Sequence, residues 1–354
     1  MTRAFGAALV GLAAGTALSA ATASAQTALP EDRPLVIAHR GASGYRPEHT
    51  LGAYQLGMEL GADCVEPDLV MTKDGELVTR HEPEIGTTTD VAEKFPDRKT
   101  KRPVDGAEVE GWFTDDFTLA EIKTLRAKQP RADRSSAWNG VYEIPTLQEV
   151  IDLVQRESFR KGRLFCIYPE TKHPTYFAEH GLDIDAALVK VLDANGYTTA
   201  SSPVFVQSFE VGNLKRLATM TEVRLVQLFD DYARRPYDLA KAGDARTYKD
   251  LMAPSELRQI ATYAYGIGPW KRTIVEEDAA TGVLAPANTL IRDAHAAGLR
   301  VHPYTFRDEP RHLAKVYGND PVAEYRQFFR LGVDGVFSDH PDTALRARDG
   351  MSGG

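Results

Sequence analysis

The sequence predicts an α/β fold, an eight-stranded β/α barrel (TIM barrel), and three observations indicate it. Short apolar runs rich in Val, Ile, Phe and Tyr alternate with longer helical patterns along most of the 354 residues. This alternation is typical of a parallel sheet covered by helices. Eight parallel strands remain once one hairpin strand is set aside, and the length suits a barrel of about 250 residues or more.

Nine extended runs are present, and a turn sets one of them apart. Asp74-Gly75 separates two of the runs and is a strong hairpin signal. Leu77–His81 should therefore fold back antiparallel on the preceding run, as an extra ribbon at the barrel mouth. The eight remaining runs are Leu35–His39, Cys64–Met71, Leu164–Tyr168, Val204–Phe209, Val223–Phe229, Tyr263–Ile267, Leu299–Tyr304 and Gly335–Ser338.

Four helical stretches between these runs have recognisable ends. Thr146 is followed three residues later by Glu149, which is a capping-box pattern. A glycine follows three of the stretches directly, and glycine commonly ends a helix. The four stretches are Thr50–Leu60, Thr146–Ser158, Ile184–Asn195 and Asn288–Ala297.

The connection between His81 and Thr146 is unusually long for a barrel. It spans about 60 residues, whereas a βα loop usually has about 2–6. It is rich in charge and turns and contains one short helical pattern, Leu119–Leu125. We interpret residues 84–143, approximately, as an insertion on the C-terminal face of the barrel, where it can form one wall of the active site. The alternative is a disordered surface loop.

The first 25 residues have the features of a cleaved secretory signal. Arg3 precedes the uncharged run Ala4–Leu18, and Ala23-Ser24-Ala25 fits a small-x-small cleavage site before Gln26. An uncleaved N-terminal anchor is the alternative. No later segment is long and apolar enough to insert stably in a membrane. We therefore expect an exported protein, periplasmic or secreted, with one barrel domain over residues 35–345.

The composition excludes several classes of protein. The chain has 42 Lys and Arg against 50 Asp and Glu, a formal net charge of −8. This acidic balance argues against a non-specific nucleic-acid binder, which needs a basic face. Two cysteines exclude a disulfide scaffold and a Cys-rich zinc module.

Three carboxylates are expected to converge at one end of the barrel. Glu66 and Asp68 are two residues apart and should point to the same face of a strand, and Glu170 follows another apolar run. Because close anions in a low-dielectric site repel strongly, they need a proton, a basic partner or a cation. Three such groups suit one divalent cation with oxygen ligands, Ca²⁺ or Mg²⁺. The alternative is that these acids lie at strand ends only because strand ends are exposed to water.

Two histidines and an arginine are expected at the same rim. His39-Arg40-Gly41 stands at the end of the first strand run, and His81 ends the hairpin strand. Two imidazoles can share acid and base work near neutral pH. The guanidinium fork of Arg40 suits a phosphate or carboxylate. These groups would meet where a β/α barrel has its active site.

The chain resembles the glycerophosphodiester phosphodiesterase family, most closely its periplasmic, calcium-dependent type. The resemblance covers most of the chain and rests on several motifs taken together. These are His39-Arg40-Gly41-Ala42-Ser43-Gly44-Tyr45, Pro47-Glu48-His49-Thr50, Glu66-x-Asp68, Met71-Thr72-Lys73-Asp74-Gly75, His81, Tyr168-Pro169-Glu170-Thr171-Lys172, Val301-His302-Pro303-Tyr304-Thr305 and Phe337-Ser338-Asp339-His340-Pro341-Asp342.

The resemblance implies a role for each matching residue. His39 and His81 would be the general acid and base, and Glu66, Asp68 and Glu170 would hold the cation, Ca²⁺ before Mg²⁺. The substrate-binding residues would be Arg40 on the phosphate, Tyr304 in a glycerol pocket and, as weaker assignments, Lys172 and Glu48. Trp270 is a further pocket candidate, because it follows a strand at the barrel mouth.

The implied reaction is hydrolysis of small glycerophosphodiesters, such as glycerophosphocholine and glycerophosphoethanolamine, to sn-glycerol 3-phosphate and an alcohol. The nucleophile is either water or the neighbouring glycerol hydroxyl. A phospholipase C- or D-like enzyme and a hydrolase of glycerol phosphate polymers are the alternatives on the same barrel. A catalytically silent binding protein is disfavoured because every required group is present.

The two cysteines are expected on the strands that carry the carboxylates. Cys64 lies two residues before Glu66, and Cys166 lies four before Glu170, both in an inward-facing register. If Leu77–His81 is the hairpin strand, the two cysteine strands are neighbours. A disulfide is then conceivable in an oxidising compartment, and two buried free thiols are the alternative.

Overall fold

The computed structural model describes residues 1–2, 28–30, 32–278 and 280–351. The predicted signal peptide, residues 1–25, falls almost entirely on residues 3–27 and so lies outside the described residues. Among the residues that are described, no helix is both long and apolar enough to cross a bilayer.

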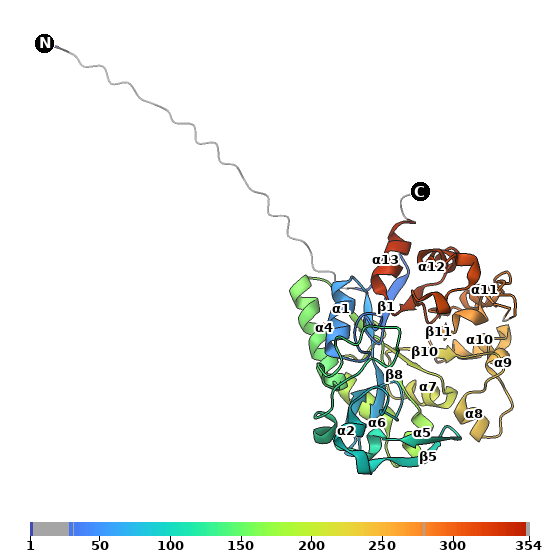
Figure 1. Ribbon diagram of the computed structural model, residues 1–354. Coiled ribbons are helices and arrows are strands. Elements are labelled where there is room, and N and C mark those ends of the chain that lie inside the picture. The colour runs from blue at the N-terminus through green and yellow to red at the C-terminus, as the bar shows by residue number, and fades with distance from the viewer. Residues whose placement is uncertain (3–27, 31, 279, 352–354) are drawn as a thin grey trace.

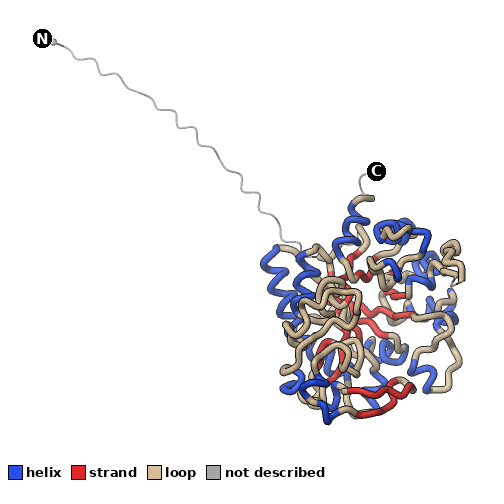
Figure 2. The backbone as a smooth tube through the Cα atoms, viewed as in Figure 1, coloured by secondary structure: helices blue, strands red, loops and turns tan. Residues whose placement is uncertain are grey.

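Parallel strands form the centre of the molecule, and helices surround them (Figures 1 and 2). They are β1 (Leu35–His39), β2 (Cys64–Glu66), β3 (Asp68–Met71), β7 (Cys166–Ile167), β8 (Glu170–Thr171), β9 (Phe205–Ser208), β10 (Arg224–Phe229), β11 (Gly266–Pro269), β12 (Arg300–Val301) and β13 (Gly335–Ser338). The fourth strand, β4 (Leu77–Thr79), pairs antiparallel with β3. The hairpin predicted at Asp74-Gly75 is therefore confirmed.

The strands close into a barrel. One run of neighbours is β13-β1-β2-β7, and the other is β12-β11-β10-β9-β8-β3-β4. The chain joins the two runs where β2 continues into β3 and where β7 continues into β8. At the opposite seam Phe306, just after β12, pairs in parallel with Ser338 of β13. Counting each continued pair once gives eight parallel positions, so the predicted β/α barrel is confirmed.

Several predicted strands are shorter or divided because of proline and helix ends. Cys64–Met71 is two strands because Pro67 has no N–H for the ladder, and Pro169 divides β7 from β8 in the same way. The run predicted at Tyr263–Ile267 is instead β11, which begins at Gly266. The N–H groups of Tyr263 and Ala264 both donate to the carbonyl of Ile260, so these residues finish the preceding helix.

The four predicted helices are present and begin within two residues of their predicted starts. Thr146 and Glu149 form the complete capping box, and the following helix continues beyond Ser158 to Lys161. The helices are α1 (Leu51–Glu59), α4 (Leu147–Lys161), α5 (Pro174–Glu179), α6 (Ile184–Ala194), α7 (Val211–Leu217), α8 (Tyr237–Lys241), α9 (Tyr248–Leu251), α10 (Pro254–Ile260), α11 (Leu290–Ala296), α12 (Pro321–Arg330) and α13 (Pro341–Asp349), with 3-10 turns at Lys271–Thr273, Pro310–His312 and Lys315–Tyr317.

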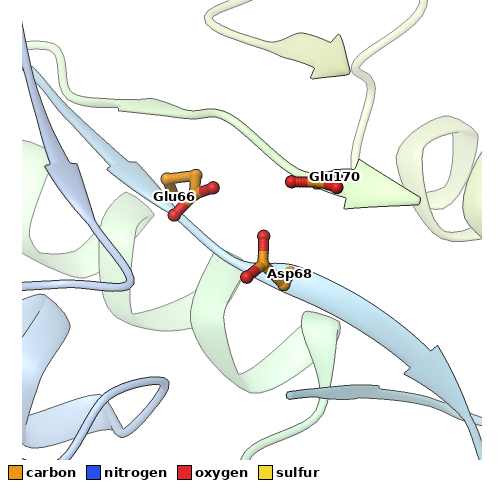
Figure 3. A group of neighbouring side chains, drawn as sticks. All are labelled: Glu66, Asp68 and Glu170. Atoms are coloured by element: carbon orange, nitrogen blue, oxygen red, sulfur yellow. The ribbon is translucent and has the colours of Figure 1, made fainter. Parts of the chain in front are cut away.

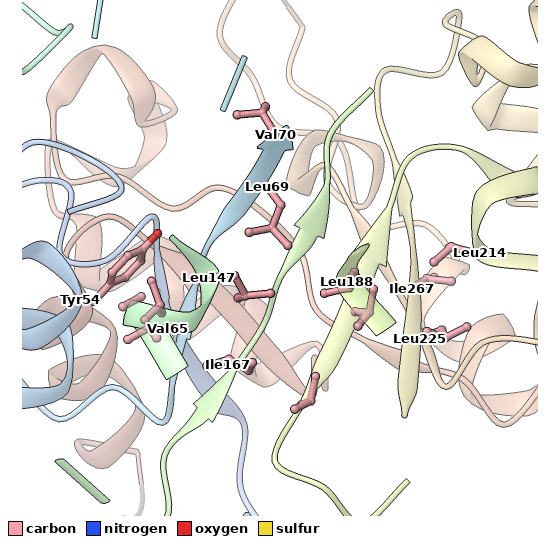
Figure 4. Close-up of a cluster of buried hydrophobic side chains, with 14 of the residues drawn as sticks. Tyr54, Val65, Leu69, Val70, Leu147, Ile167, Leu188, Leu214, Leu225 and Ile267 are labelled. Carbon is pink, nitrogen blue, oxygen red and sulfur yellow. The ribbon is translucent and has the colours of Figure 1, made fainter. Parts of the chain in front are cut away.

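The core lies between the outer face of the barrel and this ring of helices (Figure 4). Leu69, Ile167 and Leu225 point outward from their strands and are met by Leu147 and Leu188 from the helices. All five are fully buried or nearly so. Removing apolar surface from water on this scale supplies the main driving force that holds the strand ends, and therefore the site, in place.

The insertion is ordered, so the disordered-loop alternative is wrong. It contains α2 (Val91–Lys94), β5 (Thr100–Val104), β6 (Ala107–Gly111), α3 (Leu119–Ile122) and 3-10 turns at Pro96–Arg98 and Thr114–Asp116. Phe113, Phe117 and Leu125 are completely buried and join the main core. The β5–β6 hairpin was not predicted, although Asp105-Gly106 carries the signal: both residues have positive φ, as its turn requires.

The two cysteines stand opposite each other in the barrel wall and are joined by a disulfide. Cys64 of β2 pairs in register with Cys166 of β7, and the structure links the two sulfur atoms. Both residues are fully buried. Of the two alternatives left open by the sequence, the structure has the disulfide.

Reduction of this disulfide should destabilise the fold. A cross-link between residues 102 positions apart removes conformational entropy from the unfolded chain, typically about 2–4 kcal/mol of stability. We expect the doubly substituted Cys64→Ala, Cys166→Ala protein to unfold at a lower temperature by circular dichroism. The oxidised wild type, unfolded without reductant, should show no titratable thiol. Two free thiols in that sample would contradict the disulfide.

Candidate active site

Three buried carboxylates meet at the mouth of the barrel (Figure 3). Glu66 ends β2, Asp68 begins β3 and Glu170 begins β8, where it stands in register beside Asp68. One oxygen from each of the three lies within 4.8 Å of the others. The sequence predicted this convergence, and the three strands that supply the groups bring it about.

The carboxylates repel one another strongly in this buried position. Burial, with Asp68 and Glu170 nearby, raises the pKa of Glu66 well above its ordinary value. Burial and the Asp68 charge also raise the pKa of Glu170, to about 7, although Lys172 opposes the shift. Asp68 stays ionised because, despite its burial, His49 and Lys172 hold its pKa low. A bound cation would relieve this repulsion.

The residues present fit a divalent cation. Oδ1 of Asp68 and Oε1 of Gln207 are buried oxygens without a hydrogen-bond partner. Nε2 of Gln207 donates to Oε1 of Glu66 at 3.0 Å, which brings the amide to the cluster. Buried acceptors without donors are costly, and hard oxygen ligands are what Ca²⁺ and Mg²⁺ take. Gln207 was not predicted, because a single Gln in a strand gives no signal.

His39 is held by a buried carboxylate from the other end of the chain. Its Nδ1–H donates to Oδ1 of Asp339 at 2.6 Å. Oδ2 of Asp339 accepts from Arg134 at 2.5 Å and from Arg307 at 2.9 Å. These charges hold the pKa of Asp339 well below its ordinary value despite its burial. Burial and Arg40 lower the pKa of His39 to about 3, so its Nε2 is an unprotonated acceptor.

His81 has a comparable arrangement on the opposite side of the cleft. Its Nδ1 lies 2.8 Å from Glu82, and Glu82 also accepts from Nε2 of His173 at 2.9 Å. Asp105, in the turn of the inserted hairpin, binds the other nitrogen of His173 at 2.7 Å. Although burial opposes it, these two carboxylates raise the pKa of His173 to about 9. The cationic imidazole of His173 therefore holds the Glu82 carboxylate in contact with Nδ1 of His81.

Arg40 reaches the cleft through an unusual backbone turn. Its φ is 58°, and its backbone N–H donates to Oε2 of Glu66 at 2.7 Å. The next residue must be glycine, because a Cβ on Gly41 would lie 2.5 Å from the backbone of Ala53. The guanidinium binds Glu48 at 3.1 Å, and its Nε is 3.5 Å from Asp68.

The predicted substrate-binding residues occupy different positions. Arg40, Tyr304 and Trp270 line the cleft that the two candidate histidines also line, a space of about 160 Å³. Lys172 lines an adjoining cleft and donates to Glu170 at 2.9 Å. Glu48 is buried, lines neither cleft and accepts two hydrogen bonds from the Arg40 guanidinium, so it orients Arg40.

Two residues around the metal candidates were not assigned roles from the sequence. The Nε2–H of His49 donates to Oδ2 of the ionised Asp68 at 2.9 Å, and its Nδ1 lies 2.8 Å from the hydroxyl of Tyr54. It therefore orients Asp68. Asp339 stood within a recognised motif, but its partner His39 is 300 positions away, and nothing in the local pattern indicates that pairing.

Comparisons with known proteins agree with this geometry. The profile of the glycerophosphoryl diester phosphodiesterase family matches residues 39–343. Glycerophosphodiester phosphodiesterase GDPD6 of Arabidopsis thaliana is 36% identical over 326 residues, covering 88% of this chain and 85% of its own. The glycerophosphodiester phosphodiesterase of Haemophilus influenzae is 31% identical over 347 residues, covering 92% and 93%.

Solved structures share the fold at lower identity. A phosphodiesterase from Oleispira antarctica superposes with a TM-score of 0.59 at 22% identity, covering 90% of this chain and 97% of its own. A glycerophosphodiester phosphodiesterase from Agrobacterium tumefaciens gives 0.56 at 20% identity, covering 88% and 98%. From its profile match, its curated relatives and its barrel, the chain belongs to the glycerophosphoryl diester phosphodiesterase family of enzymes.

Proposed function

We propose that the protein hydrolyses small glycerophosphodiesters, such as glycerophosphocholine and glycerophosphoethanolamine, to sn-glycerol 3-phosphate and an alcohol. The observation that carries the proposal is the pair of imidazoles, each bound through Nδ1 to a carboxylate, in one cleft with carboxylates of the buried cluster. The Oleispira antarctica structure is a complex with the product sn-glycerol-3-phosphate, which supports the same product here.

His39 and His81 are the acid–base pair in this proposal. Their Nδ1 atoms are engaged by Asp339 and Glu82, so Nε2 is the nitrogen available for proton transfer. One accepts the proton of the nucleophile, either water or the neighbouring glycerol hydroxyl. The other returns a proton to the departing alcohol oxygen. Arg40 binds the phosphate, and its contacts with Glu48 fix the guanidinium for that purpose.

Glu66, Asp68 and Glu170 would hold one divalent cation, Ca²⁺ in our proposal, with Mg²⁺ as the alternative. Their carboxylates and the amide oxygen of Gln207 are the hard ligands that Ca²⁺ accepts in variable geometry. A cation bound there supplies Lewis-acid polarisation of a phosphate oxygen and offsets charge in the transition state.

The insertion favours a water-soluble diester over an intact lipid. Within its described residues, the large exposed apolar side chains are Trp138 and Val141. Trp138 stacks on Tyr142, and Arg46 covers its ring at 4.9 Å. A lipid-binding rim needs a broader apolar patch than this.

Export to the periplasm or outside the cell is also part of the proposal. Two independent features support it: the signal-like residues 1–25, with cleavage near Ala25-Gln26, and the Cys64–Cys166 disulfide. Structural disulfides persist in oxidising compartments and are rare in the cytosol.

Loss of either histidine should nearly abolish turnover. We expect His39→Ala and His81→Ala each to lower kcat on glycerophosphocholine by roughly 10²-fold or more, because each removes one proton transfer. Release of glycerol 3-phosphate is measured by a coupled assay, and circular dichroism checks the fold. His312→Ala, a substitution outside the catalytic cleft, is the matched control. Near-normal turnover in either variant would contradict the assignment, and release of phosphocholine would indicate a phospholipase C-like cleavage.

Removal of the cation should abolish activity and lower stability. We expect EGTA to eliminate turnover and Ca²⁺ to restore it. A ligand at about 100 times its Kd stabilises the folded state by about 2.7 kcal/mol, so Ca²⁺ should raise Tm independently of any assay of activity. Glu170→Gln should lose this Tm shift, whereas the exposed Glu222→Gln should keep it. Equal Tm with and without Ca²⁺ and Mg²⁺ would remove the cation from the proposal.

Asp339 should act through His39. We expect Asp339→Asn to lower kcat by roughly 10²-fold or more with little change in KM, because an amide no longer fixes the Nδ1–H tautomer. Glu309→Gln is the control, since Glu309 shares Arg134 with Asp339 but does not contact His39. If the two variants lose the same small amount of kcat, Asp339 has only a structural role.

A further inference from the structure

A second cleft adjoins the catalytic one. It encloses about 550 Å³, and Trp270, Thr305 and Arg307 line both spaces. The two clefts therefore adjoin at these three side chains. A substrate whose phosphodiester lies beside His39 and Arg40 can extend one arm into this second space, which we call the outer cleft.

Guanidinium groups from two separate segments gather at the outer cleft. Arg307 and Arg311 line it, and Arg131, in the insertion, is close enough for its charge to act on His312 of the same cleft. Nε of Arg307 is used by Asp339, and Nη2 of Arg311 by Asp133 at 2.8 Å. Among the described residues, the Arg131 guanidinium has no ion pair within 4.0 Å.

His312 lies beside these cations, and its Nε2 accepts from Nε of Arg311 at 3.2 Å. Burial and the charges of Arg307, Arg311 and Arg131 lower the pKa of its imidazole to about 4, so it is neutral near pH 7. Arginine side chains that line one cleft favour an anionic ligand.

The floor of the outer cleft also offers a donor without a partner. Lys271 and Arg272 share one buried carboxylate, Glu324, at 2.7 and 2.9 Å. Arg272 is 9% exposed, and its Nη1 is buried without a hydrogen bond. A buried charged donor in this state is costly, and an anionic ligand would satisfy it.

The acidic side chains of the outer cleft already have local partners. Asp231 accepts from the backbone N–H of Ala233 at 2.9 Å, and Glu277 lies 3.3 Å from Arg272. Glu276 faces the hydroxyl of Tyr232, whose pKa burial and Glu276 together raise to about 12. These contacts tie the three carboxylates to neighbouring groups, whereas Nη1 of Arg272 has no hydrogen bond within the part of the chain that the structure describes.

We propose that the outer cleft is a second anionic subsite, which binds a phosphate or carboxylate carried on one arm of the substrate beyond the scissile phosphodiester. The proposal rests on the proposed function and narrows it to a substrate class: glycerophosphodiesters with an additional anionic group. Arg131, Arg307 and Arg311 provide the recognition, and Arg307 links this subsite to the catalytic cleft.

Two matched pairs of substrates test the subsite. Glycerophosphoglycerol is compared with the same diester bearing a terminal phosphate, and glycerophosphoethanolamine with glycerophosphoserine, which adds one carboxylate. Because hydrogen bonds to charged groups are worth about 1.5–3 kcal/mol, we expect kcat/KM to be roughly tenfold higher for the terminal phosphate. A similar preference for the serine diester identifies a general anion site, and its absence identifies a phosphate site.

Substitutions separate the subsite from the chemistry. Arg131→Gln and Arg311→Gln should each reduce the preference for the anionic diester several-fold while leaving kcat/KM on glycerophosphoglycerol unchanged. Arg292→Gln, an exposed arginine on a distant helix, should change neither value. Equal kcat/KM for both members of each pair in the wild type would overturn the subsite alone. Failure to cleave any of the four diesters would overturn the proposed function and the subsite with it.

Discussion

Repulsion among three buried carboxylates is the constraint around which the site is organised. One oxygen from each of Glu66, Asp68 and Glu170 lies within 4.8 Å of the others. All three side chains are buried, so solvent screens their charges weakly. Their neighbours are donors: Arg40 and Gln207 bind Glu66, and Lys172 binds Glu170. These donors compensate only part of the charge, because oxygens of Asp68 and Gln207 remain without partners. The barrel can hold such a destabilised cluster because its extensive apolar core fixes the strands that carry it.

The same fold also fixes two imidazole rings, those of His39 and His81, at the rim of the barrel. Each ring uses a carboxylate to engage Nδ1, but the supports differ. Asp339 is buried and held by two arginines, whereas Glu82 is half exposed and held by a cationic histidine. Both supports depend on the insertion: Arg134 reaches Asp339, and Asp105 reaches His173. The insertion thus contributes to the positioning of both imidazoles.

Much of the barrel and of its metal candidates could be predicted from the sequence, for local reasons. Alternation along a strand places Glu66 and Asp68 on one face, and the Asp74-Gly75 turn removes the ninth strand from the count. The pairing of His39 with Asp339 could not be predicted in this way, because the two residues are 300 positions apart and meet only when β13 closes the barrel beside β1. The contact of Glu48 with Arg40 could not be predicted for a related reason: a motif indicates proximity to the site, but not which group a carboxylate binds there.

The insertion also connects substrate recognition with catalysis. Arg131 and Arg134 belong to one tight turn, in which the N–H of Arg134 donates to the carbonyl of Arg131 at 3.1 Å. Arg134 is buried against Asp339 and the carbonyl of Ser43, while Arg131 has no acidic partner and faces the cations of the outer cleft. Asp339 in turn binds Nδ1 of His39. The recognition proposed for Arg131 and the support of His39 therefore rest on one short turn of the insertion, in which each arginine has its own task.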